Sequence, residues 1–310
     1  MNPVALAMKA QDERTDMVQT IGEFMRGYSI EATRPTADDV AALGGMVAPG
    51  TGVYVSAVPT QQSDEAVGHA ARLRKSGFEP VPHIAVRAFA DVVEIDRFLG
   101  RLAAEAGVRQ VLVIAGDRDP PAGPLRSALD VIDSGLLQRH GIREVGIAGY
   151  PEGHPKIPSH ELDRALADKI AAAQATGLQI HIVSQFCFNA DAIIAWVRRL
   201  RDFGFDAPVR IGLAGPTSLP TLMRYASRCG VSASIHGLAR HAGLMRQLFA
   251  MSAPDAIVRA LAAERASLGE VRAHFFSFGG LARTARWASA VERDQITLEP
   301  GQGFRVEPAT

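Results

Sequence analysis

The feature that most constrains the fold of this chain is an alternation of short β-rich runs with segments of helical spacing, repeated eight times along 310 residues. Several of the runs are almost continuously apolar, as expected of parallel strands that are buried on both faces. The runs are residues 28–33, 53–58, 81–86, 110–117, 144–151, 179–188, 209–215 and 274–279. Strand–helix alternation predicts a parallel sheet with right-handed crossovers, and eight such units close into a (β/α)8 barrel.

The segments between the runs are amphipathic and end in helix-stop signals. In residues 64–78 and 92–108 the apolar side chains recur on one helical face, and glycines follow the last turn at Gly77 and Gly107. The spacing breaks once, between residues 215 and 274. We expect extra helices there, with an additional short strand an open alternative. These elements would be helices at 219–229, 236–250 and 253–267 and the strand at 232–235.

We expect one catalytic domain, because no Ser/Gly-rich linker divides the chain. The barrel is predicted to occupy residues 28–292. Residues 1–27 would form a helical extension, and its helix at 12–26 would plug the bottom of the barrel. Residues 293–310 would form a loosely attached tail.

The composition favours a soluble cytoplasmic enzyme. Lys plus Arg and Asp plus Glu both number 33, so the formal net charge is zero and gives no reason to expect nucleic acid or an anionic membrane as a partner. Two cysteines cannot build a disulfide framework, and their spacing does not suggest zinc. The N-terminus lacks the apolar stretch of a signal peptide, and no run approaches the length of a membrane span.

Polar residues gather at the ends of the predicted strands, where chemistry belongs in a barrel of this class. Buried polar groups cost free energy unless they are paired, so a concentration of them indicates a site. The strand-end residues are Glu31, Ser56, His83, Asp117, Tyr150, Glu152, His154, Gln185, Asn189, Gly215 and Ser277.

Glu31 and Asp117 are the carboxylates of this set. Glu31 lies in an otherwise apolar run, so burial should raise its pKa and suit it to general acid catalysis. The alternative is a rim glutamate paired with Arg34. Asp117 ends the run IAGD, where Gly116 allows close backbone approach to a ligand. Its alternative role is a helix N-cap or a turn residue.

The run AGYPEGHP places Tyr150, Glu152 and His154 directly after the fifth strand. Three polar groups within five residues favour function over a merely stiff Pro/Gly loop. Gln185 stands among aromatic residues in SQFCF, and its amide could bind the edge of a heterocycle or, alternatively, a neighbouring strand end. Cys187 is interpreted as a core residue. The motifs GxGxxG, GxxxxGK[ST], HExxH and GxSxG are absent, which argues against a Rossmann dinucleotide site, and we expect no metal ligands.

Taken together, several motifs resemble the short, catalytic-domain type of methylenetetrahydrofolate reductase, in the right order from residue 28 to residue 290. They are SIEATRP, VPHIAV, IAGDRDPP, GYPEGHP, SQFCFNADAI and HFF, of which AGYPEGHP followed by SQF is the most specific. The resemblance implies a (β/α)8 barrel that carries FAD and takes NADH or NADPH as co-substrate. It implies interconversion of 5,10-methylene- and 5-methyltetrahydrofolate, with hydride passing through the flavin.

The resemblance also implies residue roles. Glu31 would donate the proton that activates the methylene bridge, and Asp117 would lie between flavin and pterin. Gln185 would bind the pterin and the nicotinamide in turn, and Ser56 takes the place of a threonine at the substrate. Flavin contacts would come from His83, Gly116, Asp117, Tyr150, His154 and Lys169.

Two departures from the family pattern stand out. Ala115 replaces an arginine before Gly-Asp, and Gly280 stands where an arginine that contacts folate is expected. Two alternatives therefore stay open: a related barrel enzyme acting on another pterin or without flavin, or a non-catalytic barrel subunit of a partner enzyme. Whether the chain forms a homo-oligomer is also open.

Overall fold

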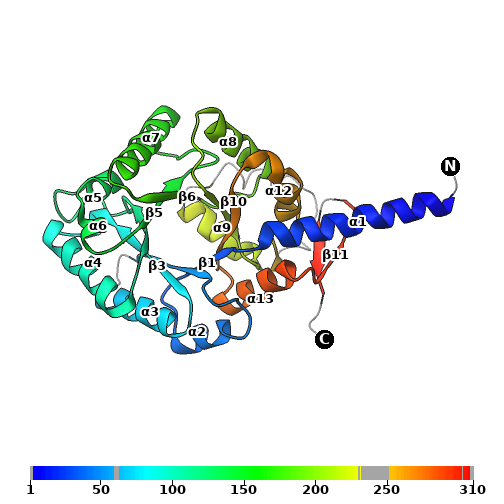
Figure 1. Cartoon of the computed structure of the whole chain (residues 1–310), viewed down its shortest axis with the longest axis horizontal. Helices are drawn as coiled ribbons and strands as arrows, with labels where there is room; N and C mark the ends of the chain where they lie inside the picture. Colours follow the sequence, from blue (N-terminus) through cyan, green and yellow to red (C-terminus); the bar gives the residue numbers. More distant parts are fainter. Residues whose placement is uncertain (1–2, 59–62, 230, 232–250, 302, 308–310) are drawn as a thin grey trace.

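Eight parallel strands close into a barrel, as the alternation predicts (Figure 1). The computed structural model describes residues 3–58, 63–229, 231, 251–301 and 303–307, with residues 3–11 and 251 in backbone only. The order around the barrel is β1-β10-β7-β6-β5-β4-β3-β2. Each of the eight predicted runs contains or overlaps one strand: β1 (Ser29–Ala32), β2 (Gly52–Val55), β3 (Glu79–Ala85), β4 (Gln110–Ile114), β5 (Glu144–Gly149), β6 (Gln179–Ser184), β7 (Val209–Ala214) and β10 (Val271–Phe276).

Helices surround the barrel and pack on its outer face (Figure 1). They are α2 (Ala37–Leu43), α3 (Ser63–Lys75), α4 (Val92–Ala106), α5 (Ala128–Ile132), α6 (Leu136–Arg139), α7 (Ser159–Ala175), α8 (Ala190–Asp202), α12 (Asp255–Leu268) and α13 (Leu281–Glu292), with the 3-10 turn η1 (Val86–Ala88) after β3. In α4 the side chain of Asp91 caps the first turn by accepting from the backbone of Glu94, and Gly107 ends the helix in the left-handed conformation. Val92, expected on the buried face of this helix, is 43% exposed because it lies in the first turn.

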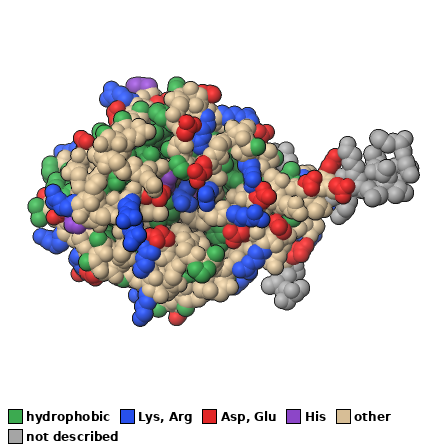
Figure 2. Space-filling model, viewed as in Figure 1, with side chains coloured by type: hydrophobic (Ala, Val, Ile, Leu, Met, Phe, Trp, Pro, Cys, Tyr) green, Lys and Arg blue, Asp and Glu red, His purple; other side chains and the backbone are tan. Residues whose placement is uncertain are grey.

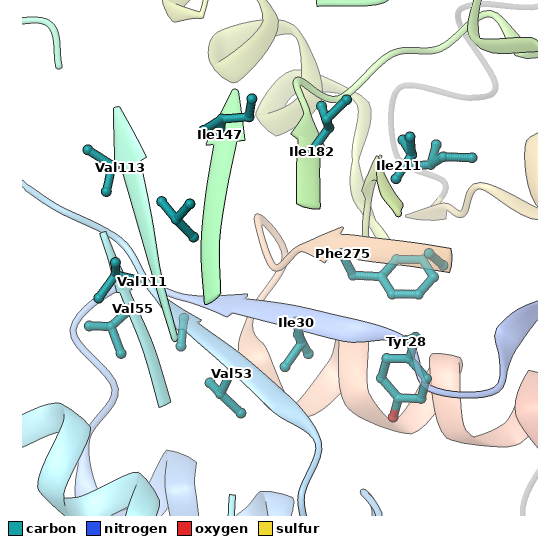
Figure 3. Packing of buried hydrophobic residues seen from close by; sticks show 14 of the residues in the cluster. Tyr28, Ile30, Val53, Val55, Val111, Val113, Ile147, Ile182, Ile211 and Phe275 are labelled. Atoms are coloured by element: carbon teal, nitrogen blue, oxygen red, sulfur yellow. The ribbon is translucent and has the colours of Figure 1, made fainter. Parts of the chain in front are cut away.

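The main core lies between the strands and the helices. Alternate strand residues such as Ile30, Val53 and Val113 belong to this outer cluster together with helix residues (Figure 3). Because successive side chains of a strand point to opposite faces, their neighbours point into the barrel. Glu31 and Tyr54, which are register partners on β1 and β2, are therefore interior residues.

The long segment before the last barrel strand contains α9 (Leu219–Arg228) and α12, close to two of the predicted extra helices. A small antiparallel sheet of β8 (Thr217–Ser218) and β9 (Met251–Ser252) was not anticipated. The helix expected at 236–250 and the strand expected at 232–235 lie outside the described residues.

The first helix, α1 (Pro3–Met25), lies along α12 and α13 and extends beyond the barrel (Figure 1). It covers one side of the barrel, so the expectation that it plugs the bottom is not supported. The tail forms a second small sheet from β11 (Ile296–Leu298) and β12 (Phe304–Val306), and Phe304 stacks on Trp287 of α13. The division of the chain after residues 27 and 292 stays a proposal.

Candidate active site

Glu31 is held at the carboxyl end of β1 by contacts from both neighbouring strands. Ser56, just after β2, donates its hydroxyl hydrogen to Glu31 Oε1 over 2.6 Å. A hydroxyl carries one hydrogen, so Thr33 Oγ1, 2.9 Å from Ser56 Oγ, must be the donor in the second bond. Ser277, just after β10, donates to the backbone carbonyl of Glu31. The carboxylate is thus fixed at Oε1, whereas Oε2 faces the barrel axis.

Two histidines face Glu31 Oε2 from other strands. Nε2 of His83 on β3 lies 3.8 Å from this oxygen, and Nε2 of His274 on β10 lies 3.6 Å from it. Neither nitrogen has a hydrogen-bond partner among the described residues, although both are buried. The Nδ1 atom of His274 is held 2.9 Å from Ser29 Oγ. Buried polar atoms without partners are rare, so this cluster is a strong indication of a functional site.

The pKa of Glu31 differs from what burial alone predicts. Burial is the largest effect and raises it, but the nearby imidazoles of His83 and His274 and the hydrogen bond from Ser56 together outweigh burial and lower the pKa. Burial lowers the pKa of both histidines. The free site therefore keeps Glu31 ionised at neutral pH. The expected rise in its pKa is wrong because the compensating groups come from other strands.

A cavity of about 140 Å³ opens at the carboxyl ends of β5 and β6. Its walls are residues 150–155, residues 185–187, Cys229 and Val231. The rings of Tyr150 and His154 meet edge to face at 5.3 Å. The structure thus brings the polar run after the fifth strand and Gln185 to one cavity.

Gln185 uses its backbone and its side chain differently. The backbone N–H donates to Gly149 O over 2.8 Å, and the side-chain Oε1 accepts from the backbone N–H of Phe186 over 3.0 Å. The bond to a neighbouring strand end is therefore made by the backbone, not by the amide. Cys187 is 1% exposed and is a core residue, as expected, and Asn189 caps α8 instead of lining the cavity.

Asp117 lies on the exposed loop after β4. It is no helix cap, because Ser127 caps the next helix, α5. Its charge acts on the cavity wall: burial first and then the Asp117 charge raise the pKa values of Tyr150 and Cys229. Gly116 has φ +86°, which favours glycine.

Lys169 lies on α7, outside the residues that line the cavity. Burial lowers its pKa to about 8. Its role at a cofactor stays a prediction.

The sequence reasoning missed three interior residues, Tyr54, His181 and His274. Period-2 alternation could have placed all three inside the barrel, since each neighbours an outward-facing residue of its strand. Cys229 was also missed, because it follows a helix in the irregular segment. Among the described residues, no cluster of histidine, cysteine or carboxylate is arranged to hold a metal ion.

A family model described as methylenetetrahydrofolate reductase matches residues 55–267, which is more than half of the chain. The chain belongs to the methylenetetrahydrofolate reductase family. The match confirms the resemblance seen in the motifs. It contains Ser56, His83, Asp117 and Gln185, whereas Glu31 lies outside the matched residues and joins this group through barrel closure.

Curated members of the methylenetetrahydrofolate reductase family match at modest identity. Methylenetetrahydrofolate reductase 2 of Saccharomyces cerevisiae is 28% identical over 43% of this chain and 23% of its own length. The 5,10-methylenetetrahydrofolate reductase of Salmonella typhimurium is 25% identical over 51% of each chain. The alignments thus span about a quarter to a half of these relatives. Among solved structures, dihydropteroate synthase from Thermus thermophilus superposes with a TM-score of 0.49 at 14% identity, over 86% of this chain and 92% of that one.

Proposed function

We propose that this chain is a flavin-dependent oxidoreductase that interconverts 5,10-methylenetetrahydrofolate and 5-methyltetrahydrofolate. NADH or NADPH would be the co-substrate. The observation that carries the proposal is the placement of Glu31, a buried carboxylate at the carboxyl end of β1 with one oxygen fixed by Ser56 and the other facing two histidines. Family membership supplies the reaction class, and this carboxylate supplies the acid that the reaction requires.

The residues at the barrel mouth fit a flavin. The cavity of about 140 Å³ is smaller than the roughly 300–1,000 Å³ of complete ligand pockets, so it would enclose only part of a flavin. The rest of an FAD would therefore extend along the open rim. Burial and the Asp117 charge raise the pKa of Tyr150, so its phenol stays a neutral hydrogen-bond donor. When bound, FAD would accept hydride from the nicotinamide and return it to the folate carbon.

Glu31 would hold and deliver the proton in the folate half-reaction. In the reductive direction, each turnover takes up one proton besides the hydride. A carboxylic acid at Glu31 can protonate a nitrogen of the folate methylene bridge, which weakens the carbon–nitrogen bond and favours the iminium that accepts hydride. A bound folate would further desolvate the carboxyl group and raise its pKa, so the acid forms when it is needed. His83 and His274, next to Oε2, can exchange this proton.

Asp117 and Gln185 would orient the substrates. The negative charge of Asp117 would oppose the build-up of negative charge on a reduced flavin and would stabilise a cationic iminium. Gln185 would bind the pterin and nicotinamide in turn. His83, Gly116, Tyr150, His154 and Lys169 are proposed cofactor contacts and Ser56 a substrate-side contact.

The two departures from the family pattern affect affinity more than chemistry. Gly280 adopts φ +107°, a conformation that an arginine would adopt only with strain, so the backbone here is built for glycine. Ala115 offers no cation to a cofactor phosphate. We therefore expect weaker binding of FAD and of the folate tail. A pterin-specific enzyme without flavin and a non-catalytic subunit remain the alternatives.

A cytoplasmic location belongs to the same proposal. No helix among the described residues combines the length and apolar character that a bilayer crossing demands. On the face drawn in Figure 2, acidic and basic side chains are interspersed.

A visible spectrum tests the proposal directly. Protein mixed with excess FAD should retain the flavin absorption band, and its free energy of unfolding should rise by about 2.7 kcal/mol at a hundredfold excess over Kd. NADH or NADPH should bleach the band, and methylenetetrahydrofolate should restore it. Protein that stays colourless and gains no stability would rule out the flavin; bleaching without reoxidation by folate would point to a different oxidant.

A further inference from the structure

The barrel interior below Glu31 is unusually polar on one side. Such barrels are typically filled by layers of branched apolar side chains. Here Tyr54 on β2 and His181 on β6 are fully or almost fully buried inside, next to an apolar cluster of Val81, Leu112 and Val183. Below them Glu144, the first residue of β5, is 22% exposed at the amino end of the barrel. A buried polar group in this position needs a specific partner or it destabilises the fold.

These groups form a continuous chain of short contacts, which we name the interior column and define as Glu144, His181 and Tyr54. Glu144 Oε1 lies 2.7 Å from His181 Nδ1, and His181 Nε2 lies 2.7 Å from the Tyr54 hydroxyl. The close contact with His181 is the main cause of a lowered pKa at Glu144, and burial lowers the pKa of His181. An ionised Glu144 and a neutral His181 favour one tautomer: the ring hydrogen lies on Nδ1, which faces the Glu144 carboxylate, and Nε2 accepts from the Tyr54 hydroxyl.

The upper end of the column touches the groups that face Glu31. The ring of Tyr54 packs edge-on against His274 with centroids 4.6 Å apart, and against His83 at 6.1 Å. These are the two imidazoles whose Nε2 atoms face Glu31 Oε2. Rotation of the Tyr54 ring would therefore displace both partners of the carboxylate.

We infer that the interior column positions the catalytic carboxylate: Glu144 fixes the tautomer of His181, His181 fixes Tyr54, and Tyr54 holds His83 and His274 against Glu31. Tyr54, His181 and Glu144 are positioning residues, since none of them lies at the mouth of the site. The inference rests on the proposed role of Glu31 as the proton donor.

The electrostatic surroundings of Glu31 agree with this arrangement. Glu31 faces Tyr54 on β2, Ser56 just after β2, His83 on β3 and His274 on β10. The remaining charged groups lie nearer the amino end of the barrel. These are Glu144 on β5, His181 on β6 and Arg210 on β7, whose guanidinium lies 5.9 Å from the Tyr54 ring centroid. The charge of Arg210 lowers the pKa of Glu144, whereas the pKa of Glu31 is lowered by the two histidines and Ser56 against the effect of burial.

The backbone of β5 makes room for the column. Gly146 is the register partner of His181, and a Cβ atom at Gly146 would lie 2.7 Å from His181 Nε2. No other residue type fits beside this ring without displacing it. The imidazole therefore occupies space that the strand leaves open for it, which is expected of a positioned group rather than of incidental filling.

Two variants and a matched control test the inference in the full chain loaded with FAD. Tyr54→Phe keeps the ring and removes the hydroxyl, and Glu144→Gln keeps the shape and frees the tautomer of His181. Glu79→Gln is the control: it makes the same change at the amino end of β3, which β4 separates from β5. The two side chains are about equally exposed (23% against 22%), but the partner of Glu79 is Arg74 on α3. We expect both column variants to slow kcat of the folate half-reaction by about 2- to 30-fold with KM unchanged, since coupled networks contribute on this scale.

The distinguishing readout is the titration of Glu31, followed by carbon-13 NMR in the ligand-free protein and assigned with Glu31→Gln. Tyr54→Phe should raise the pKa of Glu31 by about 0.4–1.5 units, the equivalent of that rate range. In Glu144→Gln, nitrogen-15 shifts should show mixed tautomers at His181. If the column is purely structural, the variants will lose stability, but the Glu31 titration and the His181 nitrogen-15 shifts will match those of Glu79→Gln. That result would overturn the inference. If the wild type reduces no folate, the proposed function fails, and the NMR comparison still decides whether the column positions Glu31. If Tyr54→Phe does not fold, Glu144→Gln, at a partly exposed position, decides alone.

Discussion

Replacing Glu31 by glutamine should separate the two half-reactions while leaving the fold intact. The amide keeps an oxygen that can accept from Ser56, now as a neutral hydrogen bond. Hydrogen bonds to charged groups contribute about 1.5–3 kcal/mol and neutral ones about 0.5–1.5 kcal/mol, so roughly 1 kcal/mol is lost there. Removing a buried charge offsets part of this loss. The amide N–H₂ can also donate to the unpartnered Nε2 atoms of His83 and His274. The free energy of unfolding should therefore change by less than about 1.5 kcal/mol.

The rate effect should be much larger and confined to folate. A glutamine cannot deliver a proton, and one general acid typically contributes about 10²- to 10⁴-fold, or roughly 2.7–5.4 kcal/mol of barrier. Reduction of the flavin by the nicotinamide needs no proton donor and should stay within a few-fold of wild type. Anaerobic stopped-flow spectroscopy measures each half-reaction separately by the loss and return of flavin absorption.

Ser56→Ala is the matched comparison, because it removes the 2.6 Å bond to Glu31 Oε1 and leaves the carboxylate in place. It should slow the folate step much less than Glu31→Gln does. Equal slowing of both half-reactions by Glu31→Gln would refute the reasoning, since Glu31 would then support the structure or position the flavin.

Three further outcomes are expected. Asp117→Asn should raise the reduction potential of bound flavin, because a nearby negative charge disfavours the anionic reduced form. The same variant should still slow the folate step. An unchanged potential in a redox titration would remove Asp117 from the site. Gly146→Ala should destabilise the fold by about 1–3 kcal/mol in urea unfolding, because its Cβ would overlap His181, whereas Gly68→Ala on the exposed face of α3 should stabilise it by about 0.5–1 kcal/mol. The free energy of unfolding should fall as the pH drops below about 6.5, because His83, His181 and His274 have lowered pKa values in the folded protein and the unfolded chain therefore takes up protons first. A flat pH profile of stability would contradict their burial as neutral rings.

The sequence predicted most of the fold, because the signals it rests on are local. Burial of a strand on both faces shows directly as an apolar run, and helix ends show as glycine at positions such as Gly107. Eight repeats of such signals are enough to predict closure into a barrel. The same repeats indicated which end of each strand should carry chemistry, and Glu31 and Gln185 were proposed as site residues from strand ends alone. The misplaced α1 and the unexpected β8 and β9 lie where the repeat is absent.

What the sequence determined by itself was therefore the barrel, the end of the barrel that carries the site, and the residue types present there. The tertiary structure decided their chemical state. Closure of the sheet pairs β1 with β10 and places His274 beside Glu31 across more than two hundred residues of chain, and these partners reverse the pKa shift that burial alone would cause. The interior column was equally invisible in the sequence, because Glu144, His181 and Tyr54 come from three strands. Hydrogen bonding and electrostatic coupling depend on distances of a few ångströms, which only the closed barrel sets.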